Sequence, residues 1–173
     1  MRIHELNTPA LVADADVLER NLRTMSAALP GARLRPHQLV VVGPARAPLP
    51  NHGREVVVRG YLNDPELVSL YRRASMVVQP SLYEGFGLPV LEAMACGTPV
   101  ACADIRAFRE VAGECAVYFD PRNAVAIADA MEELAGDPAL CEDQVRGGRV
   151  RARRFSWEAG ARALLEVFGE AVS

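Results

Sequence analysis

The sequence predicts an α/β protein in which helices cover both faces of a doubly wound parallel sheet of about six strands. Short apolar runs rich in β-branched residues, such as Leu39–Val42 and Val56–Val58, alternate with segments of helical periodicity. Glycine, proline, asparagine or aspartate stands between most of these segments, where strands end and helices begin. Parallel strands need such crossover connections, so the alternation favours a parallel sheet.

Length and composition indicate an ordinary globular domain. The chain has 173 residues, of which 50% are hydrophobic, and a formal net charge of −3. One domain of this size can bury a substantial core. The slightly negative charge gives no reason to expect a nucleic-acid partner. The sequence shows neither a long apolar run nor a basic leader, so we expect a cytoplasmic protein.

Two residue types restrict the chemistry. All 19 basic residues are arginine, and without lysine the chain cannot form a lysine Schiff base. The four cysteines lack the CxxC pairs and spacing of a metal site, and we expect them to be small buried hydrophobes in a reducing compartment. They are Cys96, Cys102, Cys115 and Cys141.

The N-terminal part predicts a strand, a helix and two further strands. The strand covers Thr8–Ala13, and Asp14 or Asp16 then caps a helix that stops at Pro30-Gly31. The apolar face of this helix consists of Leu18, Leu22, Met25 and Leu29. The strand Leu39–Val42 ends at Gly43, a loop follows over Ala45–Arg54, and the strand Val56–Val58 closes at Gly60.

The remainder continues the alternation. Asn63 or Asp64 caps a helix whose inner face is Leu67, Leu70, Tyr71 and Ala74. Further strands are predicted at Met76–Val78, Val100–Ala103 and Ala116–Phe119, with a short helix within Asp104–Ala112. Asn123, Asp137-Pro138 and Ser156 each begin a helix, the second weakened by Gly147-Gly148. The last helix carries an apolar face of Trp157, Ala161, Leu164, Leu165 and Phe168.

The stretch from Pro80 to Val100 (PSLYEGFGLPVLEAMACGTPV) carries the chemistry. Gly85 and Gly87 form a loop that a ligand can approach closely, and Pro89 suits the first turn of the helix that follows. Free amides and the positive end of the helix dipole make such an N-terminus an anion site. Glu84 and Glu92 flank it. Phosphate at the helix end, with carboxylates accepting hydroxyl protons on either side, suits a sugar nucleotide.

The first 37 residues resemble the N-terminus of D-threonine aldolase-like pyridoxal-phosphate proteins. The resemblance rests on Leu6–Val12, Asp14, Leu18–Leu22 and the sequence Leu34-Arg35-Pro36-His37. The family places its cofactor lysine soon after the Arg-Pro-His, but Gln38–Val42 follows here. With no lysine anywhere, we expect no pyridoxal phosphate and no other cofactor. A generic strand and amphipathic helix explain the segment as well as kinship does.

From Leu39 onward the chain resembles the C-terminal, donor-binding domain of retaining GT-B glycosyltransferases of group 1 (family 4). The motifs are Leu39–Gly43, Val58–Tyr61, Leu67 with Tyr71, Pro80–Val100, Arg109–Gly113 and Phe155–Glu158. The resemblance implies a single Rossmann-like domain over 38–173, with 1–37 as a strand-helix unit, a candidate fusion segment, that completes the sheet. It also implies transfer of a hexose from a UDP- or GDP-linked sugar with retention, without an obligatory metal.

The resemblance also assigns roles to residues. Glu84, the expected catalytic residue, contacts the hydroxyls of the donor hexose, and the amides of Gly85, Phe86 and Gly87 meet the sugar and the diphosphate. Leu88 lies at the far end of this phosphate cradle, and Glu92 holds the ribose hydroxyls. Arg59, Gly60 and Tyr61 form the backbone edge that holds the nucleobase. Gly43 is the turn that leaves room for the donor.

Two features of the family are missing. The chain has no room for the N-terminal, acceptor-binding domain, so we expect a separate acceptor-binding domain or chain as partner. The arginine and lysine that usually reach the diphosphate are absent, and Ala13-Asp14-Ala15-Asp16 stands there instead. We therefore expect weak donor binding and no transfer by the chain itself. The alternatives are a non-catalytic, truncated or chimeric nucleotide-sugar-binding module and, remotely, a fragment of a D-threonine aldolase-like enzyme.

Several other residues have an ordinary structural interpretation. We expect Glu110 to be a solvated helix residue and Tyr71 and Trp157 to be core or edge aromatics. The histidines His4, His37 and His52 belong to no constellation. The arginine cluster Arg146, Arg149, Arg151, Arg153 and Arg154 is expected to form a solvated helix face, with contact to an acidic membrane surface as the minor alternative.

Overall fold

The computed structural model describes residues 10–14, 38–43 and 56–172, and these form an α/β domain with one parallel sheet. The strand order is β3-β2-β1-β4-β5-β6, and every neighbouring pair is parallel. This is the order of the doubly wound Rossmann fold, so the predicted fold class is confirmed. The strands are β1 (Ala10–Asp14), β2 (Gln38–Val42), β3 (Val56–Arg59), β4 (Ala74–Gln79), β5 (Val100–Ala103) and β6 (Val117–Phe119).

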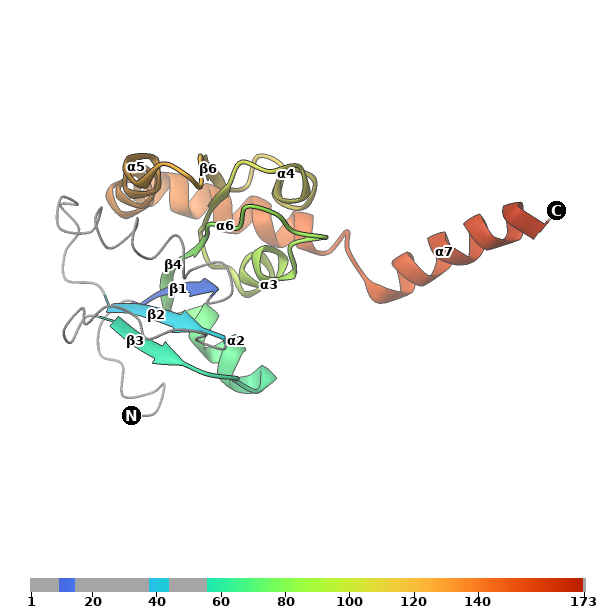
Figure 1. The fold of residues 1–173 in the computed structure, drawn as a ribbon, viewed down its shortest axis with the longest axis horizontal. Helices are drawn as coiled ribbons and strands as arrows, with labels where there is room; N and C mark the ends of the chain where they lie inside the picture. Colours follow the sequence, from blue (N-terminus) through green and yellow to red (C-terminus); the bar gives the residue numbers. More distant parts are fainter. Residues whose placement is uncertain (1–9, 15–37, 44–55, 173) are drawn as a thin grey trace.

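The helices follow the strands in the expected alternation. They are α2 (Asp64–Arg73), α3 (Leu88–Cys96), α4 (Arg106–Ala112), α5 (Ala124–Gly136), α6 (Pro138–Ala152) and α7 (Trp157–Val172). In Figure 1, α3 and α4 lie on one side of the β4–β6 half of the sheet and α5 lies on the other. Helix α6 crosses over and contacts α3, α4 and α5, so it closes this half of the domain.

The strand of the predicted N-terminal unit 1–37 lies in the middle of the sheet. β1 pairs with β2 on one side, Leu11 opposite Leu39, and with β4 on the other, Leu11 opposite Met76. This strand therefore completes the sheet, as expected. The predicted helix after Asp14 or Asp16, the histidines and the loop Ala45–Arg54 lie outside the described residues, and the division of the chain at residue 37 stays a prediction.

Polar caps begin the helices where the sequence predicts them. Asn63 Oδ1 accepts a hydrogen bond from the Glu66 amide at 3.0 Å, and Glu66 Oε2 accepts one from the Asn63 amide at 3.1 Å. The side chains of Asn123, Asp137 and Ser156 accept bonds from the first amides of α5, α6 and α7. Such caps satisfy amides that have no partner within the helix.

The core lies between the sheet and its helices. Val40, Val78 and Val100 of the strands and Phe108 and Ile127 of the helices are 0% exposed. Cys102 is also fully buried, whereas Cys96, Cys115 and Cys141 are partly exposed, so the expectation of buried cysteines holds fully for one of the four. Among the described helices none is long and apolar enough to cross a membrane.

Two sequence predictions need correction. Ala74, assigned to the inner face of α2, is the first residue of β4. Helix α6 begins at Pro138 as predicted and continues through Gly147 and Gly148, where a Cβ at Gly148 would lie 3.4 Å from Met94, so the glycine allows α6 to approach α3 closely. Trp157 of α7 is neither core nor edge, because it is 83% exposed and α7 extends away from the domain (Figure 1).

Candidate donor-binding site

The predicted site lies at the edge of the sheet where the strands end. β1 and β4 are neighbours at the centre, and the chain order runs from β1 outward to β3 on one side and from β4 outward to β6 on the other. The carboxyl end of this pair is the topological switch point, where doubly wound sheets bind their ligands. The loop from Pro80 to Gly87 follows β4 directly at this point. The sequence prediction that the glycine loop lies at a carboxyl edge is confirmed.

A buried hydrogen-bond network fixes the Glu84 carboxylate. The Ser81 hydroxyl donates to Glu84 Oε1 at 2.7 Å, and the Gln79 amide nitrogen donates to Ser81 Oγ at 2.9 Å and to the same Oε1 at 3.4 Å. Gln79 and Ser81 are 1% and 0% exposed, while Glu84 is half-buried. Because both donors use Oε1, Oε2 accepts no hydrogen bond from the described residues. That oxygen can accept from the hydroxyl of a ligand.

The glycine loop leads into α3 with a left-handed residue. Gly87 has φ of 103°, and its carbonyl accepts from the amides of Val90 and Leu91 at 3.1 and 3.2 Å. A Cβ on Gly87 would stand 2.8 Å from the buried ring of Phe108, so only glycine fits this turn. Around Gly85, by contrast, no atom lies within 4 Å of the Cβ position.

The N-terminus of α3 carries no side-chain cap and no acidic residue in its first turn. In its first turn Pro89 has no N–H, and the amides of Val90 and Leu91 donate to Gly87. The amide of Leu88 and the positive end of the helix dipole therefore stay available to an anion. Leu88 and Phe86 beside it are each 43% exposed. The Phe86 ring meets Phe155 edge-on, with ring centroids 5.7 Å apart, and this contact supports the loop from the end of α6.

Glu92 lies one turn further along α3, where α2 holds it. The buried Tyr71 donates its hydroxyl hydrogen to Glu92 Oε2 at 3.1 Å. Burial raises the pKa of the Glu92 carboxyl, the hydrogen bond from Tyr71 opposes that rise, and the charge of Asp64 adds to it. The carboxyl group is partly buried against Tyr71, but the residue as a whole is exposed, so Glu92 can reach a ligand at the helix start.

The residues predicted to hold the nucleobase lie on the other half of the same edge. Gly43 at the end of β2 has φ of 121°, and its amide donates to the Arg59 carbonyl at the end of β3 at 3.1 Å. Gly60 is exposed and Tyr61 is 92% exposed. With strands about 4.8 Å apart, β2 and β3 lie roughly 10 and 14 Å from β4. The structure therefore places the two predicted groups along one edge, without bringing them into contact.

One cation near this edge is already engaged. Arg109, which follows β5, binds Asp104 through two hydrogen bonds of 2.7 and 2.8 Å and stacks over the Tyr118 ring at 3.7 Å. The hydrogen bond from Arg109 lowers the pKa of Asp104. Asp14 is the last residue of β1, and Asp16 lies outside the described residues. The described residues hold no group of three His, Cys, Asp or Glu side chains suited to a metal.

Four residues of the site escaped the sequence prediction or were given another role. Gln79 and Ser81 fix Glu84, Phe108 supports Gly87, and Tyr71, expected only in the core, also holds Glu92. The sequence held one signal for Gln79, because it is a polar residue at the end of the apolar strand Met76–Val78. Glu110 is exposed on α4, as expected.

The family is decided by a match over most of the chain. The family model of glycosyl transferases group 1 matches residues 11–137. The chain belongs to the group 1 glycosyltransferases. The group 1 relatives among curated proteins include O-antigen chain mannosyltransferase B of Escherichia coli, 41% identical over 99 residues, and D-inositol 3-phosphate glycosyltransferase of Arthrobacter sp. (strain FB24), 32% identical over 180 residues.

Solved structures agree with this family. Sucrose-phosphate synthase from Thermosynechococcus elongatus matches with a TM-score of 0.79 and 28% identity over 96% of this chain. HepE of Anabaena, solved in complex with UDP and glucose, shares the fold with a TM-score of 0.77 and 16% identity over 94% of this chain. The alignment with the mannosyltransferase covers 57% of this chain and 26% of that relative. The alignment with the inositol phosphate glycosyltransferase covers 99% of this chain and 41% of that relative. This group 1 chain spans 47% and 49% of the two solved chains.

Proposed function

We propose that the chain is the donor-binding half of a glycosyltransferase, which binds a nucleotide sugar at the switch point and transfers its hexose with retention when a partner supplies the acceptor. The observation that carries this proposal is the Gln79–Ser81–Glu84 network beside the uncapped N-terminus of α3. A buried network that presents one carboxylate oxygen outward is suited to a hydroxyl-rich ligand, and the helix end beside it to an anion.

Each part of the donor has a corresponding feature at the edge of the sheet. The hexose hydroxyls would donate to Glu84 Oε2, and the diphosphate would meet the amides of the loop and of α3. The ribose hydroxyls would donate to Glu92, while the base would lie toward Arg59, Gly60 and Tyr61. When the nucleoside diphosphate departs, the negative charge that develops on it would be stabilised by the helix N-terminus.

Helix α7 indicates where a partner domain would dock. Its apolar residues recur with helical spacing, yet they are 55–83% exposed. They are Trp157, Leu164, Leu165 and Phe168. A helix with such a face is normally covered, and the relatives and solved structures are about twice as long as this chain or longer. We infer that the face packs against an acceptor-binding domain, either on the same polypeptide or on another chain.

Calorimetry with UDP-glucose and GDP-mannose tests donor binding. Glu84→Ala removes hydrogen bonds to a charged group worth about 1.5–3 kcal/mol each, so we expect affinity to fall by about 10- to 150-fold. Glu92→Ala should weaken binding by a similar factor, because the ribose contact is of the same kind. Glu110→Ala, an exposed carboxylate on α4, is the matched control and should leave affinity unchanged. Binding that survives both site variants would place the donor elsewhere.

A non-catalytic binding module is the second candidate. Asp14, the last residue of β1 at the switch point, favours it because an acidic residue there opposes the binding of a diphosphate. Release of free nucleotide and of hexosylated acceptor separates the two candidates. We expect donor binding but no transfer by the purified chain, and transfer once an acceptor-binding domain is added. Robust transfer by the chain with no partner would show that the active site is already complete.

A further inference from the structure

A pocket of about 520 Å³ lies at the end of α3 opposite to the donor site. It is lined by Arg72 of α2, by Ala95 and Cys96 of α3, and by Arg149, Ala152 and Arg153 of α6. Helix α3 has nine residues, so this pocket lies about 13 Å from the uncapped N-terminus of the same helix. It is therefore a separate site at the other edge of the sheet.

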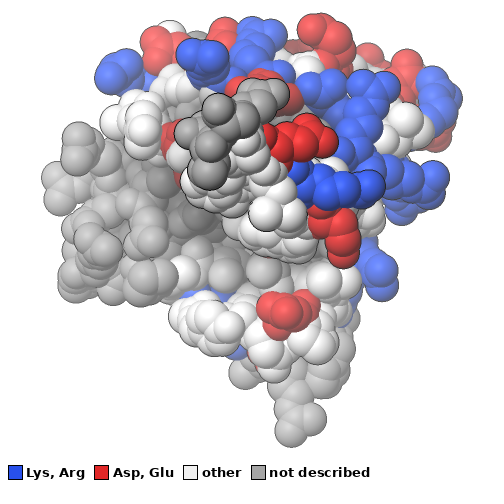
Figure 2. Space-filling view, turned by 90° about the vertical axis from the view of Figure 1, so that its right-hand side faces the viewer, with Lys and Arg blue, Asp and Glu red and all other residues white. Residues whose placement is uncertain are grey.

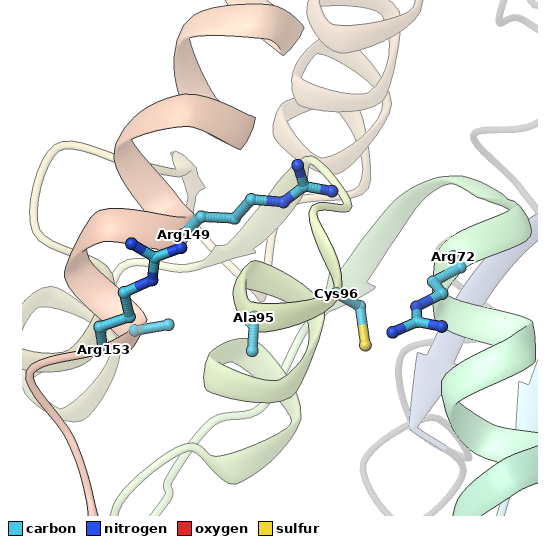
Figure 3. A pocket seen from close by; sticks show the side chains of 6 residues that line it. Arg72, Ala95, Cys96, Arg149 and Arg153 are labelled. Carbon is cyan, nitrogen blue, oxygen red and sulfur yellow. The ribbon is translucent and has the colours of Figure 1, made fainter.

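Half of the residues that line this pocket are arginines and none is acidic. In Figure 3 the guanidinium group of Arg72 lies beside the Cys96 sulfur, and that of Arg153 is directed toward the Arg149 side chain. Arg149 extends over the loop after α3, where the Cβ position of Gly97 is 2.5 Å from its Nε. Three arginines from two helices thus line one cavity. Their positive charges repel one another, and an anion bound between them would offset that repulsion.

An ordinary structural role does not explain these arginines. Arg151 on α6 has such a structural role. It donates to the carbonyls of Val111 and Glu110 at 2.6 Å each and so caps the end of α4. Arg72, Arg149 and Arg153 make no hydrogen bond or ion pair with any described residue. The last turn of α3 is already closed by the amides of Gly97 and Thr98, which donate to Met94 and Ala93.

The charges of two pocket arginines meet at Cys96. Figure 2 shows arginine side chains, with acidic side chains among them, on the face toward which α7 points. Burial raises the pKa of the Cys96 thiol, the charges of Arg72 and Arg149 oppose that rise, and the Glu92 carboxylate adds to it. The two guanidinium groups therefore act on the same small space. Planar guanidinium groups bind phosphate oxygens through paired hydrogen bonds, so the chemistry of the pocket suits a phosphate group.

We propose that the pocket formed by Arg72, Arg149 and Arg153 binds a phosphate group of a ligand other than the sugar donor. The phosphate belongs either to a soluble phosphorylated compound or to the headgroup of an anionic lipid. In both cases the phosphate oxygens accept hydrogen bonds from the guanidinium groups and lie close to Cys96. The proposal does not depend on the function proposed for the donor site.

Alkylation of Cys96 tests this site, and the variants described next separate it from the donor site. Iodoacetamide reacts with the thiolate, so pyrophosphate in the pocket should slow modification of Cys96, both by covering it and by disfavouring its negative charge. We expect at least a fivefold slower rate at saturating pyrophosphate, measured by peptide mass spectrometry. Cys115, which is partly exposed and lines neither this pocket nor the neighbouring one beside Arg149, is the internal control and should react at an unchanged rate.

Paired variants of equal charge change distinguish the pocket from general ionic attraction. R72Q/R153Q should abolish protection of Cys96, whereas R154Q/R162Q, which removes two exposed arginines outside the pocket, should retain it. Circular dichroism confirms that both variants fold, and sodium chloride at equal ionic strength serves as the salt control. Protection lost equally in both variants, or reproduced by sodium chloride, would overturn the proposal.

Vesicles identify the source of the phosphate. Protection of Cys96 by phosphatidylcholine vesicles containing phosphatidic acid, but not by pure phosphatidylcholine, would assign the pocket to a lipid headgroup. Protection by pyrophosphate together with none by the vesicles would assign it to a soluble compound. If neither pyrophosphate nor the acidic vesicles slow the reaction of Cys96, the pocket does not bind phosphate and the proposal is wrong.

Discussion

Gly87 is the residue on which the geometry of the donor loop depends most directly. Its φ of 103° is a conformation that residues with a Cβ rarely adopt. In Gly87→Ala the new methyl group would also stand 2.8 and 2.9 Å from two atoms of the Phe108 ring, which is 0% exposed. The substitution therefore adds backbone strain and a clash with a side chain that has no room to move.

The two effects can be estimated separately. A left-handed conformation costs a residue with a side chain about 1–3 kcal/mol. Overpacking of a buried site costs about 1–3 kcal/mol more. We therefore expect the free energy of unfolding of Gly87→Ala to fall by roughly 2–6 kcal/mol. Gly85→Ala should change it by less than about 1 kcal/mol, because Gly85 has no atom within 4 Å of its Cβ position.

Urea denaturation followed by circular dichroism measures both variants. Phe108→Leu in the same background separates the clash from the strain, because the smaller side chain should reduce the cost of Gly87→Ala by about 1 kcal/mol or more. Donor affinity, where measurable, should fall with stability in Gly87→Ala. If Gly87→Ala proved no more destabilising than Gly85→Ala, the close contact between loop and Phe108 would not exist as described.

Three further predictions follow from burial and hydrogen bonding. Tyr71→Phe removes the hydrogen bond that opposes the raised pKa of Glu92. NMR titration should therefore show a higher Glu92 pKa in the variant than in the unmodified protein. A lower pKa in the variant would contradict the assigned contact. Because this folded-state pKa is raised, the contribution of Glu92 to stability is present at low pH and is lost as pH rises through it. Leu134 is 3% exposed, so Leu134→Ala should lower the free energy of unfolding in urea by about 2–5 kcal/mol. Leu164 is 55% exposed, so Leu164→Ala should lower it by less than about 0.5 kcal/mol. Equal losses would show that α7 is packed on the domain. Burial raises the pKa of the Cys102 thiol to about 12, so iodoacetamide at pH 8 should leave it unmodified in the native protein, and rapid reaction would show that the core opens there.

The sequence predicted the strands and most helix starts because their signals are local. The apolar runs at Val56–Val58 and Val100–Ala103 and the capping residues Asn63 and Asn123 act within a few residues of the elements that they define. Local signals also place Glu84 and Glu92 around a helix N-terminus. The strand order was predictable only as a class, because pairing joins segments far apart in the chain, such as β1 with β4.

Contacts between distant residues could not be predicted in the same way. Gly147-Gly148 looks like a helix breaker from composition, yet α6 continues through it because the glycines admit α3 and Cys115 at short distance. The apolar face of α7 looks like a core face, yet no described part of the chain covers it. Periodicity indicates that a face is apolar but does not indicate what lies against it.

By itself the sequence determined the fold class, the position of the glycine loop before α3 and the pair of carboxylates beside it, since backbone propensity and spacing set all three. Only the tertiary structure decided how those carboxylates are held. Ser81 and Gln79 leave Glu84 one outward oxygen, and Tyr71 reaches Glu92 from another helix. The structure likewise brought Arg72 together with the arginines of α6 around one cavity. Side chains from separate elements meet only once the chain has packed, so the folded structure sets which groups share a site.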